Sequence, residues 1–349
     1  MTQDLLLDKI RGSLVGGAVG DALGYPVEFA GSFYEIRANY GEAGVTEYDT
    51  AYPRLADRHR EAQFSDDTQM TLYTAEGLLE AVRSGEPIVP TICEAYLAWY
   101  GHQVGRTVRI GYKSALAAIT ELNQRRAPGN TCLSALAAIN SGRRPANTSK
   151  GCGGIMRVAP VALYGAAHAW SLADTGRQAG EAAELTHLHP LSTYSSAALA
   201  IIVQLCASTP DAIDRDRFIS IAKQSLDVVA ALYGPQAPYM DFFRQTILKA
   251  ISLADDSHPD WQLIERSLGG GWVAEETLAI AIFSVIRHIS DFNACMICAV
   301  NHGGDSDSTG DVAGNILGAI LGYSAIPEKF LGNLQLRQLL LDTADALRK

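Results

Sequence analysis

Two stretches of the chain place glycines four residues apart, and this spacing constrains the fold more than any other feature. Residues four apart lie on the same face of an α-helix. Each helical glycine costs roughly 1 kcal/mol relative to alanine, so close backbone packing must offset the cost. We therefore predict that residues 5–24 form a helix packed by its glycine face inside the protein, with residues 309–322 as the candidate partner. The glycines are Gly12, Gly16, Gly20 and Gly24, then Gly310, Gly314, Gly318 and Gly322.

The second glycine stretch opens with an acidic turn. Asp305 and Asp307 are each followed by a serine, Ser306 and Ser308, and a helix is expected from about Thr309. Oxygen ligands held rigidly at a helix start are what a hard cation such as Mg²⁺ or Mn²⁺ requires. One Asp or Ser alone would indicate only a helix N-cap, which remains the alternative. Two of each after a Gly-Gly turn favour the metal site.

A similar turn stands far away in the sequence. Ser65, Asp66, Asp67 and Thr68 precede an amphipathic helix at 69–83. Ser65 is a natural N-cap and aspartates are favoured in a first helical turn, so capping is a strong explanation of this stretch by itself. The repetition at two helix starts favours a shared cation, because it would relieve the repulsion between adjacent carboxylates.

A glycine-rich loop at 151–157 leads into an apolar helix at 158–164. Successive backbone N–H groups at a helix start can hold a phosphate, although such loops are common. Farther along the chain are Thr186 and His187, and a buried, hydrogen-bonded histidine is the default there. Trp272 follows three glycines and precedes an apolar helix at 277–289.

Composition excludes several classes of protein. Apolar residues make up 48% of the 349 residues, with no uninterrupted run of eighteen, so no transmembrane helix is expected. The net charge of −10 argues against a general nucleic-acid or membrane surface and fits a cytoplasmic protein. The six cysteines show no disulfide framework. Cys295 and Cys298 form a C-x-x-C pair in an apolar helical stretch, where buried thiols are favoured over a redox or zinc role.

Helical periods recur along the chain, with no persuasive strand pattern and no low-complexity linker. We therefore predict one all-α domain covering residues 1–349. Residues 31–63 have weak periodicity and are expected to form a long irregular segment with a charged patch at 54–61.

Taken together, residues 7–323 resemble the ADP-ribosylglycohydrolase family, whose members include the nitrogenase-reductase-activating glycohydrolase and the vertebrate ADP-ribosylhydrolases. Residues 20–24 with Glu28 look like the family's opening motif, and residues 65–68 look like its first metal motif. Residues 151–157, followed by Thr186 and His187, stand where the family carries a glycine loop and another recurrent pair. Residues 303–308 look like its second metal motif.

The resemblance implies an orthogonal helical bundle that cleaves the bond between ADP-ribose and an acceptor, at a centre of two Mg²⁺ or Mn²⁺ ions. Glu28, Asp67 and Asp305 are the implied catalytic residues, with Glu28 on a loop able to close over the site. Asp21 and Asp311 are expected to support the ligands. The implied metal ligands are Ser65, Asp66, Asp67, Asp305, Asp307 and Ser308. The implied substrate-binding residues are Gly151, Cys152, Gly153, Gly154, Met156, His187 and Trp272.

The chain departs from the family pattern at three places. Ser308 replaces a common Thr and keeps the hydroxyl; Cys152 and Gly154 replace the usual Asn and Ser; Arg109 stands where the nitrogenase-associated branch has an acidic residue. Removal of ADP-ribose from a protein arginine is the leading hypothesis. Serine, a metabolite or a nucleic-acid base could instead be the acceptor. A binding or immunity protein directed at an ADP-ribosyltransferase toxin is a further hypothesis. So is a relative that has lost activity, against which the retained aspartates and Glu28 argue.

Overall fold

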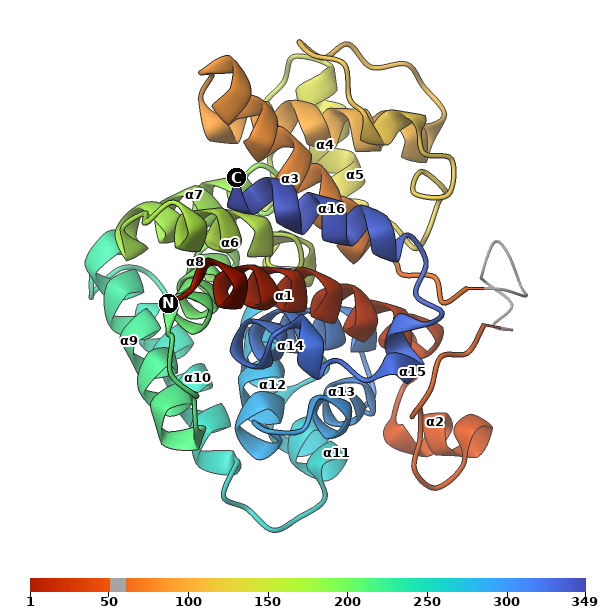
Figure 1. Ribbon diagram of the computed structural model, residues 1–349, viewed down its shortest axis with the longest axis vertical. Helices are drawn as coiled ribbons and strands as arrows, with labels where there is room; N and C mark the ends of the chain where they lie inside the picture. The colour runs from red at the N-terminus through yellow and green to blue at the C-terminus, as the bar shows by residue number, and fades with distance from the viewer. Residues whose placement is uncertain (51–60) are drawn as a thin grey trace.

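The computed structural model describes residues 1–50 and 61–349, and it confirms the all-α fold (Figure 1). Its described residues form sixteen α-helices with short 3₁₀ and π turns between them and no strand longer than an isolated bridge. The helices are α1 (Gln3–Gly24), α2 (Phe33–Tyr40), α3 (Asp66–Ser84), α4 (Ile88–Val104), α5 (Asn130–Asn140), α6 (Ala159–Ala167), α7 (Leu172–Glu184), α8 (Pro190–Ser208), α9 (Arg215–Tyr233), α10 (Met240–Leu253), α11 (Asp260–Leu263), α12 (Ala274–Arg287), α13 (Phe292–Val300), α14 (Ser306–Leu321), α15 (Glu328–Leu331) and α16 (Arg337–Arg348).

Helices α1 and α14 lie side by side through the middle of the molecule (Figure 1). Their glycine faces meet in antiparallel register, so the predicted partnership is confirmed. A Cβ atom added at Gly16 would lie 2.6 Å from the carbonyl oxygen of Gly314, and one added at Gly314 would overlap the carbonyl of Gly16. Gly12 and Gly20 face Gly318 and Gly310 in the same way. The backbones therefore touch along most of both helices.

The same register fixes the ends of the two helices. Beyond the last glycine pair, Gly24 packs on the backbone of Ser306. The C-terminal end of α1, with the 3₁₀ turn η1 (Tyr25–Val27) that follows it, thus lies against the first turn of α14. Both acidic motifs and Glu28 depend on this crossing for their positions.

Helix α8 is central to the hydrophobic core. It is long and apolar enough to cross a membrane by length and composition alone, but 89% of its apolar window is buried inside the protein. Helices α6, α7, α9 and α12 pack around it. This burial is what the core helix of a folded protein shows.

Part of the expectation for residues 31–63 was wrong, because α2 lies within that stretch. The side chain of Ser32 accepts a hydrogen bond from the N–H of Glu35 and begins the helix. Only Phe33 and Ile36 of α2 are buried, which explains its weak periodicity. Most of the predicted charged patch at 54–61 lies outside the described residues.

The glycine contact can be tested by overpacking. We expect Gly16→Leu and Gly314→Leu each to lower stability by about 1–3 kcal/mol or more, even though leucine is the better helix former, because the side chain meets backbone that cannot move aside. Thermal and urea unfolding followed by circular dichroism would measure the loss. Ala231→Leu, on an exposed position of α9, is the matched control and should change stability by no more than about 0.5 kcal/mol. Unchanged melting temperatures for both glycine variants would contradict the contact.

Candidate active site

The first acidic motif lies at the start of α3. Ser65 is the N-cap, as predicted, and its Oγ accepts a hydrogen bond from the N–H of Asp67 at 3.2 Å. Asp66 and Asp67 are 5% and 3% exposed, so neither serves as a solvated first-turn charge. One oxygen of Asp66 accepts from the N–H of Gly129 at 3.2 Å. Capping thus accounts for Ser65 and leaves the burial of both carboxylates unexplained.

The second acidic motif lies at the start of α14. Asp305 occupies the N-cap position, but its side chain makes no capping hydrogen bond. Its Oδ2 instead accepts from the thiol of Cys152 at 2.7 Å. Asp307 accepts from the N–H of Ser308, while the hydroxyl of Ser308 donates to Asp67 Oδ2 at 2.7 Å. This last bond joins the two motifs across a separation of 241 residues in the sequence.

Glu28 completes the cluster. It directly follows the turn η1 and is 8% exposed. Carboxylate oxygens of Glu28, Asp305 and Asp307 all lie within 4.8 Å of one another. Glu28 is therefore close enough to bind the same ligand as Asp305 and Asp307.

Asp21 on α1 holds the start of α3 in place. Its two oxygens accept from the N–H groups of Ser65 and Thr68 at 2.8 and 2.9 Å, and Oδ2 also accepts from the Thr68 hydroxyl at 2.6 Å. Asp311 on α14 is buried and accepts from the Asn315 amide, while its Oδ2 has no partner among the described residues. Asp21 thus holds the first acidic motif, and Asp311 lies on the helix that begins with the second.

The charge state of the cluster follows from its burial. Burial raises the pKa of Asp66 to about 8, and the neighbouring Asp21 and Asp305 add to the effect. Burial, with the charges of nearby carboxylates, holds the pKa of Asp67 and of Asp307 well above the usual range. No Lys or Arg of the described residues forms an ion pair with Asp66, Asp67, Asp305 or Asp307.

This donor set fits a hard divalent cation. Carboxylate oxygens of Glu28, Asp305 and Asp307 lie together, and the Ser308 hydroxyl links them to Asp67. Oxygen donors of this kind are the ligand chemistry of Mg²⁺ and Mn²⁺. Positive charge there would favour the ionised carboxylates, whose pKa values are raised first by burial and further by mutual repulsion. Among the described residues, Cys152 brings a sulfur atom to the site, and burial together with Asp305 raises the pKa of its thiol.

The glycine loop lies beside Asp305. It forms a short 3₁₀ turn, η3 (Cys152–Gly154), before α6. The N–H of Gly151 donates to Ser149 Oγ and that of Cys152 to the carbonyl of Trp272, so those two groups already have partners within the protein. Met156, also assigned to substrate, is 3% exposed and lies in the turn before α6.

His187 lies beneath this loop. A Cβ atom added at Gly153 would approach the His187 ring to 2.9 Å, and His187 is 2% exposed. Thr186 Oγ1 lies 2.9 Å from His187 Nδ1 and also accepts from Arg157 at 2.6 Å. Burial and the charge of Arg157 lower the pKa of His187 to about 3, so the ring is neutral. The structure thus gives His187 a supporting position under the loop.

Trp272 lies at the rim of the site. The N–H of Asp305 donates to the carbonyl of Gly270 at 2.7 Å, and Gly304 can pack on Gly270 because it has no Cβ and adopts a φ of +134°. Trp272 is 44% exposed and its ring stacks on Phe29, with ring centroids 5.7 Å apart. Sequence reasoning missed Phe29, for which the only signal was its position next to Glu28.

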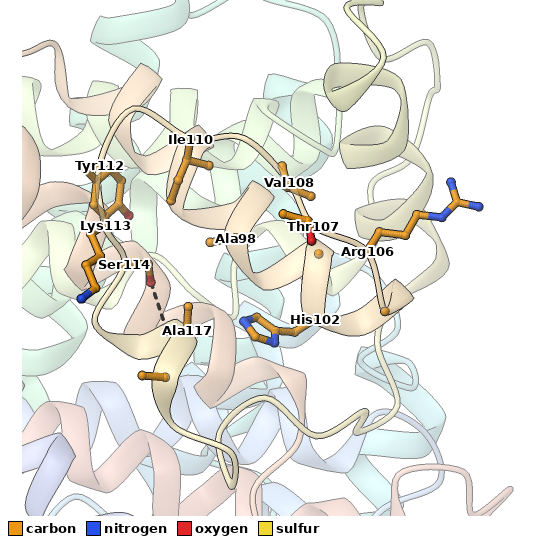
Figure 2. A pocket seen from close by; sticks show the side chains of 13 residues that line it. Ala98, His102, Arg106, Thr107, Val108, Ile110, Tyr112, Lys113, Ser114 and Ala117 are labelled. Carbon is orange, nitrogen blue, oxygen red and sulfur yellow. Dashed lines mark hydrogen bonds between the residues drawn. The ribbon is translucent and has the colours of Figure 1, made fainter.

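A separate cavity of about 630 Å³ opens between the end of α4 and residues 105–118 (Figure 2). His102, Arg106 and Lys113 are among its lining residues, and none of the predicted site residues is. Arg109, which departs from the acidic residue of one family branch, is exposed on this same loop. The cavity is therefore distinct from the carboxylate cluster.

Comparison with known proteins agrees with this arrangement. The chain is 27% identical to the ADP-ribosyl-[dinitrogen reductase] glycohydrolase of Rhodospirillum rubrum, covering 97% of this chain and 94% of that protein. It is 26% identical to the ADP-ribosylarginine hydrolase Tri1 of Serratia proteamaculans, over 98% and 79%, and 26% identical to the ADP-ribosylhydrolase ARH3 of Danio rerio, over 93% and 85%.

A solved structure has the same fold. An ADP-ribosylglycohydrolase-related protein complex contains a chain that superposes with a TM-score of 0.66 at 25% identity, covering 99% of this chain and 98% of that one. The family model for ADP-ribosylglycohydrolase matches residues 1–349. The chain therefore belongs to the ADP-ribosylglycohydrolase family.

Proposed function

We propose that this protein is a metal-dependent hydrolase that removes ADP-ribose from a modified arginine of a protein. The observation that carries the proposal is the buried group of Glu28, Asp305 and Asp307, to which the Ser308 hydroxyl joins Asp67. Membership of a family of ADP-ribosyl hydrolases supports the reaction class. Relatives named for ADP-ribosylarginine and for dinitrogen reductase support arginine as the acceptor and a modified protein as the substrate.

Two Mg²⁺ or Mn²⁺ ions would be held at the starts of α3 and α14. When bound, such ions lower the pKa of a coordinated water and orient substrate hydroxyls. The Ser308–Asp67 hydrogen bond and the support of α3 by Asp21 fix the spacing of the donors before any ligand arrives. The proposed ligands are Ser65, Asp66, Asp67, Asp305, Asp307 and Ser308.

The reaction would break the bond between ribose C1″ and a guanidine nitrogen. The oxygen of water adds to C1″, and a proton passes to the departing nitrogen. Glu28 is the candidate for this proton transfer or for orienting the ribose, because its carboxylate lies with Asp305 and Asp307. Residues 151–154 would contact the diphosphate, and Trp272 with Phe29 would line the rim.

Different acceptors would use the same core chemistry. Serine, a metabolite or a nucleic-acid base would require a different acceptor pocket around an unchanged carboxylate cluster. A binding or immunity role toward an ADP-ribosyltransferase toxin is compatible with hydrolysis. We propose a cytoplasmic location with an ADP-ribosylated protein and ADP-ribose as partners, and without general nucleic-acid or membrane binding, from the charge of −10.

Hydrolysis and acceptor choice can be tested together. Proteins modified on arginine or on serine would be incubated with the enzyme, and free ADP-ribose would be measured by chromatography. We expect release from arginine with Mg²⁺ or Mn²⁺, and none after metal removal with a chelator. If ADP-ribose is released only from the serine-modified protein, the proposed acceptor is wrong and the hydrolase activity is supported. Undiminished release in chelator would contradict the metal dependence.

The roles of Asp305 and Glu28 should separate in variants. Asp305→Asn keeps the side-chain size but removes a charge that the cations need, so we expect weaker Mg²⁺ binding and lost turnover, partly restored at high metal concentration. Glu28→Gln should leave metal content nearly unchanged and lower turnover roughly 10²–10⁴-fold if Glu28 transfers a proton in the slow step. Calorimetric metal titration and turnover would be measured on the same samples.

Asp291→Asn is the matched control. Asp291 caps α13 from an exposed position, where its side chain accepts from the N–H of Ala294 at 3.0 Å. It should retain both metal binding and turnover. If Asp305→Asn behaves like this control, Asp305 is only a helix-start residue and the proposed metal centre is wrong. Full activity in Glu28→Gln would move the proton transfer to another carboxylate.

A further inference from the structure

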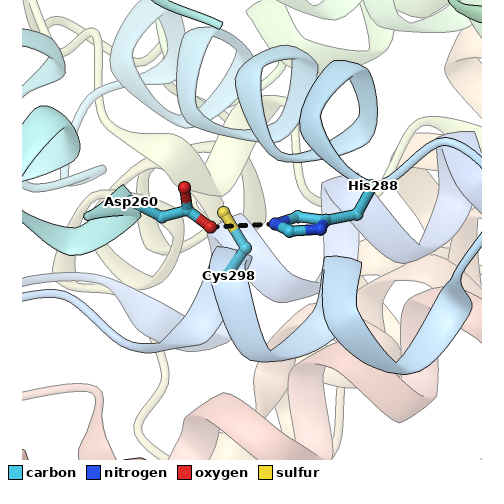
Figure 3. A group of neighbouring side chains, drawn as sticks. All are labelled: Asp260, His288 and Cys298. Carbon is cyan, nitrogen blue, oxygen red and sulfur yellow. Dashed lines mark hydrogen bonds and ion pairs between the residues drawn. The ribbon is translucent and has the colours of Figure 1, made fainter. Parts of the chain in front are cut away.

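A second cluster of potential ligands lies apart from the carboxylate site and shares no residue with it. Asp260 begins α11, His288 follows the last residue of α12, and Cys298 lies in α13 (Figure 3). His288 Nε2 is 2.8 Å from Asp260 Oδ2, and one ligand atom from each residue lies within 4.8 Å of the others. Three helices that are separate in sequence therefore bring one oxygen, one nitrogen and one sulfur donor together.

The cluster is open to solvent on one side. The Asp260 and His288 side chains are 23% and 26% exposed, while Cys298 is 5% exposed and forms the inner wall. An ion could enter past the carboxylate and the imidazole without disturbing the core. A water molecule could fill a fourth position on the same side.

Contacts from neighbouring residues fix the orientation of the Asp260 carboxylate. Arg287 contacts its Oδ1 at 2.7 Å, which leaves Oδ2 directed at His288. Arg287 is itself anchored by the carbonyl of Asp256 at 2.6 Å. Burial alone would raise the pKa of Asp260, but the hydrogen bond to His288 and the charge of Arg287 lower it, so the carboxylate is ionised. Outer contacts of this kind orient ligands in metal sites.

The surroundings of Cys298 favour the protonated thiol, so a bound cation would have to stabilise the thiolate. Burial and the nearby Asp260 charge hold the pKa of Cys298 well above its usual range, and the thiol donates to Ser284 Oγ at 3.3 Å. A protonated, buried thiol is a poor nucleophile. A divalent cation would displace its proton to solvent and replace the His288–Asp260 hydrogen bond by two bonds to the metal.

We propose that Asp260, His288 and Cys298 form a binding site for one Zn²⁺ ion, with solvent at the fourth position. Thiolate, imidazole and carboxylate are the ligands of zinc, whereas Mg²⁺ takes oxygen donors. The two clusters therefore select different cations. Zinc here would tie the start of α11 to the end of α12 and to α13, the helix that leads to the second acidic motif.

Cobalt is the probe, because Co²⁺ bound to thiolate gives a near-ultraviolet charge-transfer band. Metal-free full-length protein, kept reduced with a phosphine and supplied with excess Mg²⁺ for the oxygen site, would be titrated with Co²⁺. We expect the band to saturate at about one equivalent and to vanish when Zn²⁺ is added. Absence of the band in the wild-type protein would overturn the proposal.

Variants locate the thiolate. Cys298→Ser should abolish the band, and His288→Gln, at a partly exposed position, should weaken Co²⁺ binding at least about tenfold, as loss of a ligand or of its partner does. Cys206→Ser, a fully buried helical cysteine elsewhere in the core, is the matched control and should retain the band. Circular dichroism would verify that each variant folds. If Cys298→Ser does not fold, the Co²⁺ affinity of His288→Gln tests the proposal.

Cys152→Ser separates the two centres, because Cys152 is the thiol beside Asp305. The band should persist in this variant. If it disappears in Cys152→Ser and persists in Cys298→Ser, thiolate binding belongs to the carboxylate centre and the zinc site is wrong. The test is independent of hydrolase activity, since its readout is the metal spectrum alone.

Discussion

The direct contact between the backbones of α1 and α14 is the constraint on which the rest of the structure depends. At Gly16 and Gly314 no side chain separates the helices, so neither can shift or rotate without a backbone clash. That rigidity has a chemical consequence. Asp21 near the end of α1 and Asp307 at the start of α14 are carried into the same region, and Glu28 follows η1 to join them. The packed glycine faces of α1 and α14 thus fix the positions of the carboxylates.

Gathering those carboxylates in a buried place is unfavourable without a counter-charge. The raised pKa values of Asp66, Asp67 and Asp307 express that cost. Hydrogen bonds from neutral groups offset part of this free-energy cost, since the hydroxyl of Ser308 and the thiol of Cys152 each donate to a carboxylate oxygen. The arrangement at the two helix starts therefore supports the proposal that a cation binds there. This physical argument agrees with membership of the ADP-ribosylglycohydrolase family.

The Asp260–His288–Cys298 cluster differs from that centre in the nature of its donors. One centre offers mainly oxygen, and the other offers oxygen, nitrogen and sulfur. Hard and borderline cations differ in the donors they prefer, so the two clusters are proposed to bind different ions. The proposed zinc site uses Cys298 of the C-x-x-C pair. Cys295, the other member of the pair, is fully buried and is not a proposed ligand.

The sequence by itself determined the features that are local in the chain. Glycine spacing predicted the glycine face of each of α1 and α14, and the Ser65 cap and the adjacent acidic residues predicted two acidic helix starts. Caps and helix faces depend on neighbours within one or two turns. The family's motifs indicated Glu28. Only the tertiary structure decided that the Ser308 hydroxyl reaches Asp67, that Asp21 supports α3, that His187 lies beneath the glycine loop, and that Asp260, His288 and Cys298 meet. Such contacts join residues far apart in the chain, and helix packing sets them by backbone positions that no local pattern encodes.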